Sequence, residues 1–236
     1  KPFYTPNELG RFYGKPQNNY WVIYTDSSFK KPENIKAYPH IKEHLDRFAR
    51  VITSDNKPYG LHRARDPRFF TGEKIMSLRK CARPTFTYTD FNCYVSQSYF
   101  IIKTNRLKQK YLTGLLNSKL IAFWLKYKGK MQGDNYQVDK EPLLNLPLIK
   151  PSESKQQEIA ELVGTIIENK QNEHDYSNLL QKAKEADKFK REVKLEKALK
   201  NLEHNITRAE QQIDQEIYRL YDLAEEAIEK IEHEIK

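Results

Sequence analysis

Basic side chains are concentrated between residues 57 and 83 of this sequence, a stretch that contains eight Lys/Arg and only two Asp/Glu. An arginine can bind O6 and N7 of a guanine together, and each such pair discriminates between bases by about 1–3 kcal/mol. A lysine instead binds phosphates, which makes binding depend on salt without reading sequence. The stretch therefore predicts contact with duplex DNA. A basic face that only keeps the protein in solution is the alternative.

Residues 54–66 have the composition of an exposed loop, because they are polar, contain Pro58 and Gly60 and show no sustained hydrophobic period. We expect base-reading side chains in and beside this loop, at His62, Arg63, Arg65 and Arg68. The side chains that we expect to bind phosphates are Lys57, Lys74, Arg79, Lys80, Arg83, Lys126, Lys128 and Lys130.

Amide side chains follow the second basic group. Gln132, Asn135 and Gln137 could pair with adenine edges. They could equally be turn residues, because Gly129 and Gly133 lie beside them.

Catalytic patterns are scarce. The sequence has no phosphate-binding loop, no dinucleotide-binding glycine motif, no HExxH and no GxSxG. His40 and His44 stand four apart on a predicted helix, but a third metal ligand is missing, so two surface histidines are the favoured interpretation. Asp134, Asp139 and Glu141 resemble part of a nuclease carboxylate cluster without its earlier acidic partner. We therefore expect neither a catalytic nor a metal site.

Composition changes near Pro151. All 11 prolines lie at or before this residue, as do seven of the eight glycines. Residues 1–150 carry 27 Lys/Arg against 12 Asp/Glu, a net charge of +15, whereas residues 151–236 carry 14 against 20, a net charge of −6. This predicts a basic domain at 1–150, which would be the part that contacts DNA, followed by an acidic helical arm at 151–236.

The first part has the pattern of an α+β domain with a mixed sheet, because its elements do not alternate regularly. Runs rich in β-branched and aromatic residues predict strands at 20–24, 74–78, 85–88 and 94–102. Apolar residues at helical spacing predict helices within 35–52, after Pro39, and over 110–125.

The second part has long helical periodicity. A helix over 158–167 follows a capping residue at Ser152 or Ser154, and a near-heptad apolar seam runs over 199–220. Such a seam needs an apolar partner. We expect a coiled-coil-like antiparallel hairpin whose two helices join within 171–186. One continuous helix that forms a homodimer between chains is the competing interpretation.

The remaining composition narrows the class of protein. Two cysteines make neither a disulfide framework nor a structural zinc site, and no apolar run reaches the roughly 18–20 residues that a membrane span needs. We see no signal peptide, so a cytoplasmic protein without membrane partners is the default expectation. The first residue is Lys1, which suggests a fragment of a longer polypeptide.

A family pattern lies within residues 115–148. It resembles the TaqI-type C-terminal specificity domain of adenine-N6 DNA methyltransferases, found especially in type IIG enzymes that fuse restriction and modification. The matching segments are Leu116-Asn117-Ser118, Gly133, Tyr136, Lys140-Glu141-Pro142-Leu143 and Leu146-Pro147-Leu148. The opening Lys1-Pro2-Phe3, the strand at 19–24 and the tail to residue 223 also look like this family.

The resemblance implies that this domain selects the DNA sequence while another domain of the same polypeptide transfers the methyl group. That domain would bind S-adenosylmethionine through a glycine motif and act through Asn-Pro-Pro-Tyr/Phe, and neither motif occurs here. This fragment would thus hold no cofactor, and Mg²⁺ would matter only to a fused nuclease. The shared motifs are expected to be structural, so the resemblance does not identify base readers.

Two other functions stay open from the sequence. One is a helical scaffold for other proteins. The other is a nuclease fragment that uses Asp134 and Glu141.

Overall fold

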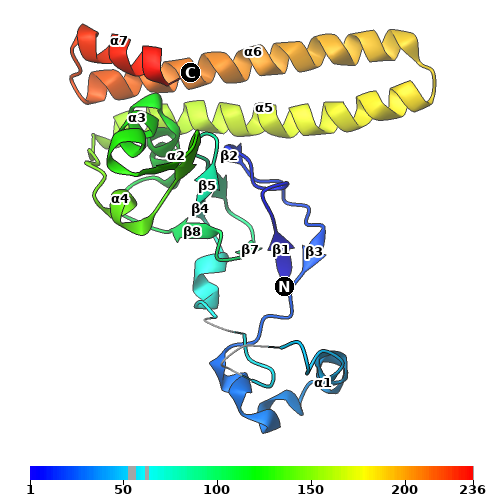
Figure 1. The fold of residues 1–236 in the computed structure, drawn as a ribbon. Coiled ribbons are helices and arrows are strands. Elements are labelled where there is room, and N and C mark those ends of the chain that lie inside the picture. The colour runs from blue at the N-terminus through cyan, green and yellow to red at the C-terminus, as the bar shows by residue number, and fades with distance from the viewer. Residues whose placement is uncertain (53–56, 62–63, 236) are drawn as a thin grey trace.

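A mixed α/β body carries a long helical hairpin across one end and a small lobe at the other (Figure 1). The structure is a computed structural model that describes residues 1–52, 57–61 and 64–235. The lobe contains the 3-10 helices Ser27–Lys30 and Pro32–Ile35 and helix α1 (Pro39–Asp46), and a third 3-10 helix, Pro67–Phe70, returns the chain to the body.

Three small sheets build the body, and two of them mix parallel and antiparallel pairs. The four-stranded sheet has the order β2 (Phe12–Tyr13), β6 (Phe86–Thr89), β4 (Lys74–Leu78), β8 (Tyr99–Ile102). The second sheet has the order β3 (Tyr20–Trp21), β1 (Pro2–Tyr4), β7 (Tyr94–Val95). The third is antiparallel, with the order β5 (Lys80–Cys81), β10 (Asn135–Gln137), β9 (Lys130–Gln132). The expected α+β fold with a mixed sheet is confirmed.

Two expected strands are shorter than the sequence pattern predicts. The strand expected over 20–24 ends at Trp21, and beyond it the Tyr24 hydroxyl donates to the backbone oxygen of Arg65 at 2.5 Å. The run 94–102 is split into β7 and β8 by a turn, in which the Ser98 N–H donates to Ser96 Oγ at 3.2 Å. In the second place a local side-chain hydrogen bond competes with the backbone pairing of a sheet, whereas the bond of Tyr24 joins segments that are remote in sequence.

The helix expected over 110–125 is two helices, α2 (Gln109–Asn117) and α3 (Lys119–Lys128). Ser118 separates them in an extended conformation, with φ −68° and ψ 156°. Its hydroxyl donates to the backbone oxygen of Leu115 at 2.7 Å and accepts from the N–H of Ile121 at 3.3 Å. Ser118 thus ends one helix and caps the next. The helix expected within 35–52 is limited to α1.

Asn117 fastens α2 to the four-stranded sheet. Its side-chain oxygen accepts from the N–H of Phe86 at 3.1 Å, and its nitrogen donates to the backbone oxygens of Phe86 at 2.7 Å and Thr113 at 3.0 Å. The side chain is buried, so these bonds pair backbone groups that water does not reach. The Asn-Ser pair of the family pattern is therefore structural.

The arm is the expected hairpin of two long helices, α5 (Glu153–Glu185) and α6 (Phe189–Leu220), followed by the short helix α7 (Glu225–Glu234). Ser152 caps α5 by accepting from the N–H of Lys155 at 3.3 Å. The two helices pack against each other along their length (Figure 1). They join at residues 186–188, slightly later than expected, because the apolar seam continues to Ala183, which is buried.

One hydrophobic core crosses the compositional boundary near Pro151. It contains Leu115 and Tyr111 of α2 together with Ile159, Ile213 and Ile217 of the arm. Gly114 permits the close approach, since a Cβ there would lie 3.0 Å from methyl carbons of Ile159 and Val163. The root of the arm and the body are thus packed as one unit.

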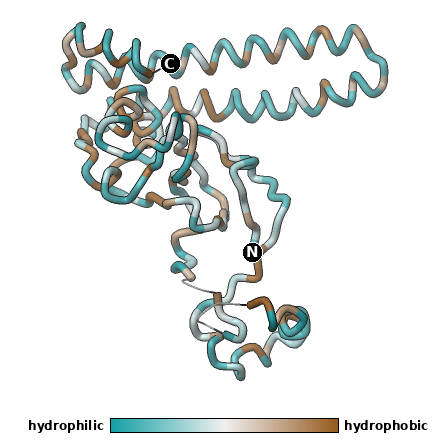
Figure 2. Tube along the Cα trace, viewed as in Figure 1, coloured by the Kyte–Doolittle hydropathy of each residue, from teal (hydrophilic) through white to brown (hydrophobic). Residues whose placement is uncertain are grey.

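The distal half of the hairpin is mostly hydrophilic, whereas apolar residues concentrate at its root and in the body (Figure 2). No helix within the described residues combines the length and the apolar character required to cross a membrane.

Candidate nucleic-acid interface

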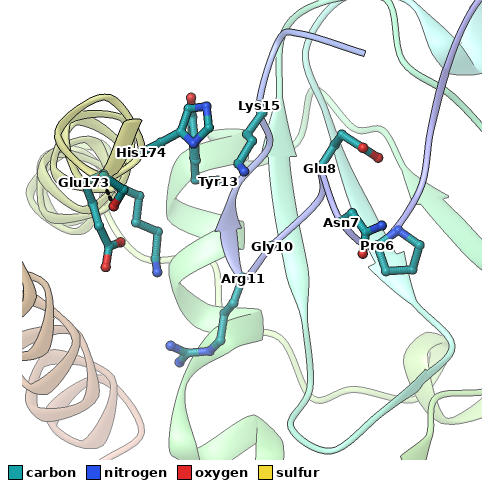
Figure 3. Close-up of a pocket in the computed structure, with 11 residues that line it drawn as sticks. Pro6, Asn7, Glu8, Gly10, Arg11, Tyr13, Lys15, Glu173 and His174 are labelled. Atoms are coloured by element: carbon teal, nitrogen blue, oxygen red, sulfur yellow. Dashed lines mark hydrogen bonds between the residues drawn. The ribbon is translucent and has the colours of Figure 1, made fainter. Parts of the chain in front are cut away.

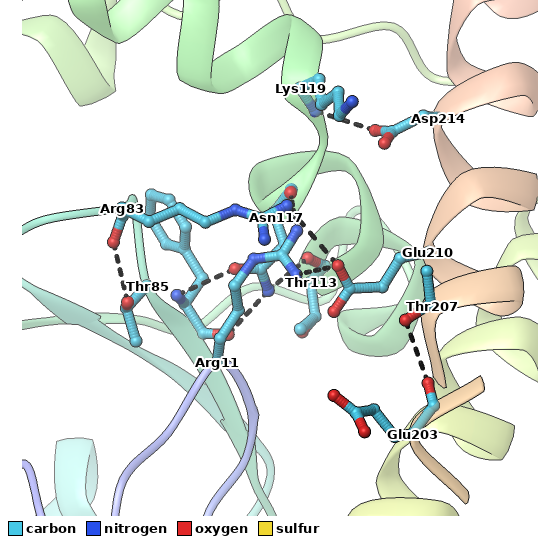
Figure 4. Close-up of polar contacts among 11 residues, drawn as sticks. Arg11, Arg83, Thr85, Thr113, Asn117, Lys119, Glu203, Thr207, Glu210 and Asp214 are labelled. Carbon is cyan, nitrogen blue, oxygen red and sulfur yellow. Dashed lines mark hydrogen bonds and ion pairs between the residues drawn. The ribbon is translucent and has the colours of Figure 1, made fainter. Parts of the chain in front are cut away.

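The body's cations fall into two groups according to what they contact. The first group faces the arm (Figure 4). The partly buried Arg83 forms an ion pair with Glu210 at 3.5 Å, and Lys126 forms one with Glu234 at 3.1 Å. Arg83 and Lys126, which we expected to bind phosphates, contact the arm in this structure, and phosphate binding by them stays a prediction. Glu210 also pairs with Arg11, so its single charge is shared between two guanidinium groups.

Arg11 belongs to the same group, and no pattern in the sequence pointed to it. It pairs with Glu210 at 2.5 Å and donates to the backbone oxygen of Asn117. Burial lowers the pKa of its guanidinium to about 10, so the side chain stays charged at neutral pH. Arg11 thus ties the N-terminal segment to both α2 and α6.

A buried carboxylate lies beside this contact. Asp214 of α6 accepts the backbone N–H of Lys119 at 2.8 Å, at the first turn of α3 (Figure 4). Burial raises the pKa of Asp214 to about 6, even though Arg11 and Lys119 favour its charged form. The joint between arm and body is therefore polar and enclosed.

Lys74, which we expected to bind phosphates, is a correction. Its side chain is fully buried, and Nζ donates to the backbone oxygens of Gly72 at 2.7 Å and Phe91 at 2.6 Å. Burial lowers the pKa of this ammonium to about 8. A phosphate group cannot reach it, so Lys74 has a structural role.

The second group of cations lies on the outer face of the sheet β5–β10–β9. Strand register places Lys80, Gln137 and Lys130 abreast, with Gln132 opposite Asn135. Because alternate residues face opposite sides of a strand, all five side chains share one face, while Tyr136 and Cys81 turn into the core. We call Lys80, Lys130, Gln132, Asn135 and Gln137 the polar face.

The polar face offers both positive charge and amide groups. Lys80 is exposed and donates to the side-chain oxygen of Gln132 at 3.0 Å. Lys130 is exposed as well, with Asp139 at 3.7 Å. Lys128, just before this sheet at the end of α3, is also exposed. Exposed lysines suit phosphates, and amide groups can pair with base edges.

Arg79 continues this surface into a cleft. A hollow of about 450 Å³ runs beside the polar face, lined by Arg79, Lys80, Gln97, Ser98 and Gln137. Arg79 and Gln97 also line a neighbouring cleft of about 590 Å³. We call this second hollow the arginine cleft, because Arg65 and Arg79 both border it, together with Tyr24, Tyr94 and Phe100.

The two arginines of the cleft retain free hydrogen-bonding capacity. Arg65 is partly buried and makes one long bond of 3.4 Å, to the backbone oxygen of Ser96. Burial lowers the pKa of Arg65 from its usual value. Arg79 lies over the Phe100 ring at 5.0 Å and reaches Asp139 at 3.4 Å. Its Nε is buried and has no partner among the described residues.

The other expected DNA contacts lie apart from the cleft or outside the described residues. Arg68 is exposed and binds Asp66 through Nε at 2.8 Å and Nη2 at 2.6 Å. Lys57 is exposed at the turn before Gly60. His62 and Arg63, two of the expected base readers, fall outside the described residues. The interface therefore rests on Arg65, Arg79 and the polar face.

Sequence reasoning missed Gln97 and Ser98, because residues 94–102 were expected to be one strand. The signal was present as three consecutive polar residues, Ser96-Gln97-Ser98, within an apolar run. In the structure these residues are exposed: Gln97 lines both hollows, Ser96 lines the arginine cleft and Ser98 lines the other hollow.

A separate pocket of about 390 Å³ lies between the segment before β2 and α5 (Figure 3). Its lining mixes charges of both signs, with Lys15 and Lys170 beside Glu8 and Glu173. That mixture does not favour a polyanion.

Metal ligands do not converge in the described part of the chain, where no three His, Cys, Asp or Glu side chains form a group that could hold an ion. Asp139 faces Arg79 and Lys130, whereas Asp134 is exposed at the turn between β9 and β10. On α1, His44 packs against the ring of Phe48 at 5.2 Å between centroids.

Comparison with known proteins places this architecture in a family. The model of the TaqI-like C-terminal specificity domain matches residues 1–148. Two proteins of Haemophilus influenzae, Type II methyltransferase M.HincII and Type II methyltransferase M.HindII (strain ATCC 51907 / DSM 11121 / KW20 / Rd), are each 30% identical over 95 residues. The alignments cover 36% of this chain but only 19% and 18% of those two proteins. This chain therefore matches about a fifth of their length. This chain belongs to the family of TaqI-like C-terminal specificity domains.

Proposed function

We propose that this chain recognises a specific sequence of duplex DNA on behalf of an adenine-N6 methyltransferase of a restriction–modification system. The observation that carries the proposal is the continuity of the polar face with the arginine cleft through Arg79. Membership of the specificity-domain family and the similarity to type II methyltransferases support it.

In this proposal different side chains of the surface contact bases and phosphates. Arg65 and Arg79 present planar guanidinium groups, which can pair with two acceptors on the same guanine. The amides of Gln97, Gln132 and Gln137 can both donate to and accept from an adenine edge. Lys80, Lys128 and Lys130 carry charge next to these groups, where phosphates would fix the register of the duplex.

Methyl transfer itself belongs, in this proposal, to another part of a longer polypeptide. The cofactor would be S-adenosylmethionine, but the sequence has neither the glycine motif nor an Asn-Pro dipeptide, so the residues present do not fit that group. Base-modifying enzymes extrude their target base from the duplex. This chain would set the register that decides which adenine is extruded, and a type IIG parent would also carry a nuclease.

The test is enrichment of binding sequences from a pool of randomised duplexes by the purified chain. The expected result is one short enriched sequence, bound more tightly than its scrambled version. A chain that binds duplexes but enriches no sequence would contradict a recognition role, and a chain that binds no duplex would remove DNA as its partner.

A further inference from the structure

Charge along the helical arm is strongly segregated. Residues 182–200, which surround the turn of the hairpin, contain eight Lys/Arg and four Asp/Glu, whereas the rest of 151–236 contains six and sixteen. The net charge of −6 on residues 151–236 is therefore the sum of +4 on residues 182–200 and −10 on the rest of that range. We call residues 182–200 the hairpin tip. It lies at the end of the arm that projects away from the body (Figure 1).

The cations of the hairpin tip are all exposed to solvent. They are Lys182, Lys184, Lys188, Lys190, Arg191, Lys194, Lys197 and Lys200. One ion pair is recorded among them, between Lys184 and Glu196 at 3.5 Å, and both of its side chains are about half exposed. The remaining positive charge of the tip is thus presented to whatever lies beside the arm.

This arrangement is unfavourable for an isolated helix. Lys190, Lys194 and Lys197 follow one another at steps of four and three residues, so they share one face of α6 and repel each other. Lys190 and Arg191 also lie in the first turn of α6, where the helix dipole disfavours positive charge. Binding of an external anion would offset both costs.

Four glutamates at the root of a second copy are already engaged by cations of their own chain. Glu210, Glu216, Glu232 and Glu234 of the root already pair with Arg11, Lys155, Lys119 and Lys126 of the same chain. A duplex, by contrast, presents an unbroken row of phosphates, with successive base pairs about 3.4 Å apart.

We propose that the hairpin tip is a second, sequence-independent binding site for the phosphate backbone, on DNA that flanks the recognised sequence. The inference rests on the proposed function. At about 1.5 Å per residue the 32 residues of α6 extend about 48 Å, the length of roughly 14 base pairs. The tip would therefore extend the contact with DNA well beyond the bases that the body reads.

The experiment compares two duplexes that contain the enriched sequence. A duplex of about 14 base pairs centred on that sequence reaches only about 24 Å to each side, whereas one of about 44 base pairs passes the tip.

The variant is the triple substitution Lys190→Gln, Lys194→Gln and Lys197→Gln, since glutamine keeps good helix propensity. The matched control replaces the same three lysines by arginine, which keeps the charge.

We measure how the dissociation constant depends on salt concentration. A plot of log affinity against log salt has a negative slope, to whose magnitude each phosphate contact contributes about 0.9. On the long duplex, we expect the magnitude of this slope to be smaller by roughly 2–3 for the glutamine variant than for the unsubstituted chain. On the short duplex its slope should equal that of the unsubstituted chain. The arginine variant should match the unsubstituted chain on both duplexes. Circular dichroism checks that the helix content is unchanged.

Three outcomes would overturn the inference while leaving the proposed function intact. The first is an unchanged slope on the long duplex. The second is an equal loss on both duplexes. The third is self-association of the unsubstituted chain that the glutamine variant abolishes in light scattering, which would make the tip, with its exposed Phe189 and Val193, an interface between copies. Failure of the unsubstituted chain to bind any duplex would instead remove the proposed function.

Discussion

The guanidinium groups of Arg65 and Arg79 are held only weakly by the rest of the chain, which bears on the role that we propose for them. Their guanidinium groups border a cleft, and each makes only one polar contact of 3.4 Å to a described residue, to Ser96 and Asp139 respectively. At that length a hydrogen bond is weak. Base edges could therefore replace these contacts at little cost, which is what a sequence-reading arginine requires.

An exposed lysine beside the polar face should behave differently from these arginines. We expect Lys128→Ala to weaken binding to the enriched and the scrambled duplex by the same factor, and to reduce the salt slope by about 1, because a phosphate contact carries no sequence information. Titrations of both duplexes at several salt concentrations check this. A loss confined to the enriched duplex would show that Lys128 contacts bases.

The joint between arm and body should respond to pH through Asp214. Burial raises its pKa from 3.8 to about 6, so between these pH values the folded chain binds more protons than the unfolded chain. The contribution of Asp214 to stability is thus lost as pH rises from about 4 to about 6.

We expect the free energy of unfolding of the unsubstituted chain, relative to Asp214→Asn, to fall by up to about 3 kcal/mol from pH 4 to pH 7. Asparagine can still accept the N–H of Lys119 but does not titrate. Urea unfolding of both proteins across this range measures the difference. A difference that is constant with pH would show that Asp214 ionises at its ordinary pKa.

At the scale of elements, the break between α2 and α3 organises the body. Asn117 pairs with both backbone groups of Phe86, and Ser118 caps the following helix. The later part of the family pattern also helps to anchor the arm, since the Tyr221 hydroxyl donates to the backbone oxygen of Pro147 at 2.8 Å. These motif residues position the interface without forming it.

Removal of the Asn117 side chain should therefore destabilise the fold. Asn117→Ala leaves the buried N–H of Phe86 without the acceptor that the side chain provides, at a cost of about 1–3 kcal/mol. Urea denaturation measures the loss. The control is Asn178→Ala on the exposed face of α5, which we expect to change stability by less than about 0.5 kcal/mol. Equal effects of the two substitutions would remove the bridging role of Asn117.

Local patterns in the sequence predicted the elements better than the site. The seam over 199–220 predicted a partner helix, for which the hairpin was the favoured of two interpretations, and Ser152 was one of the two expected caps. The split at Ser118 was missed because apolar periodicity continues through it. Its extended conformation depends on hydrogen bonds of a single hydroxyl, which a hydrophobic pattern does not reveal.

The site depended on contacts that are remote in sequence. Lys74, Arg83 and Lys126 have the composition of phosphate-binding residues, but one is buried among backbone oxygens and two meet glutamates more than 100 residues away. Conversely, Lys80, Lys130 and Gln137 are brought abreast by strand register. Charge counting finds cations, but only the fold shows which of them are buried and which groups they contact.

At the scale of the whole molecule, carboxylates of the acidic arm pair with cations on one side of the basic body. Glu210, Glu232 and Glu234 pair with Arg11, Arg83, Lys119 and Lys126 at the joint. The polar face and the arginine cleft keep their cations. The opposite charges of the two parts thus help to hold the arm on a side away from the surface that we propose for DNA.

The most direct test of the account is the ratio of dissociation constants for the scrambled and the enriched duplex, measured for the unsubstituted chain, Arg65→Ala and Arg79→Lys. Lysine keeps the charge of Arg79 but loses the planar pair of donors. The account predicts that each substitution lowers this ratio by about 5- to 150-fold, which corresponds to about 1–3 kcal/mol per base pair read, with little change for the scrambled duplex. An unchanged ratio in both variants would contradict recognition through the arginine cleft.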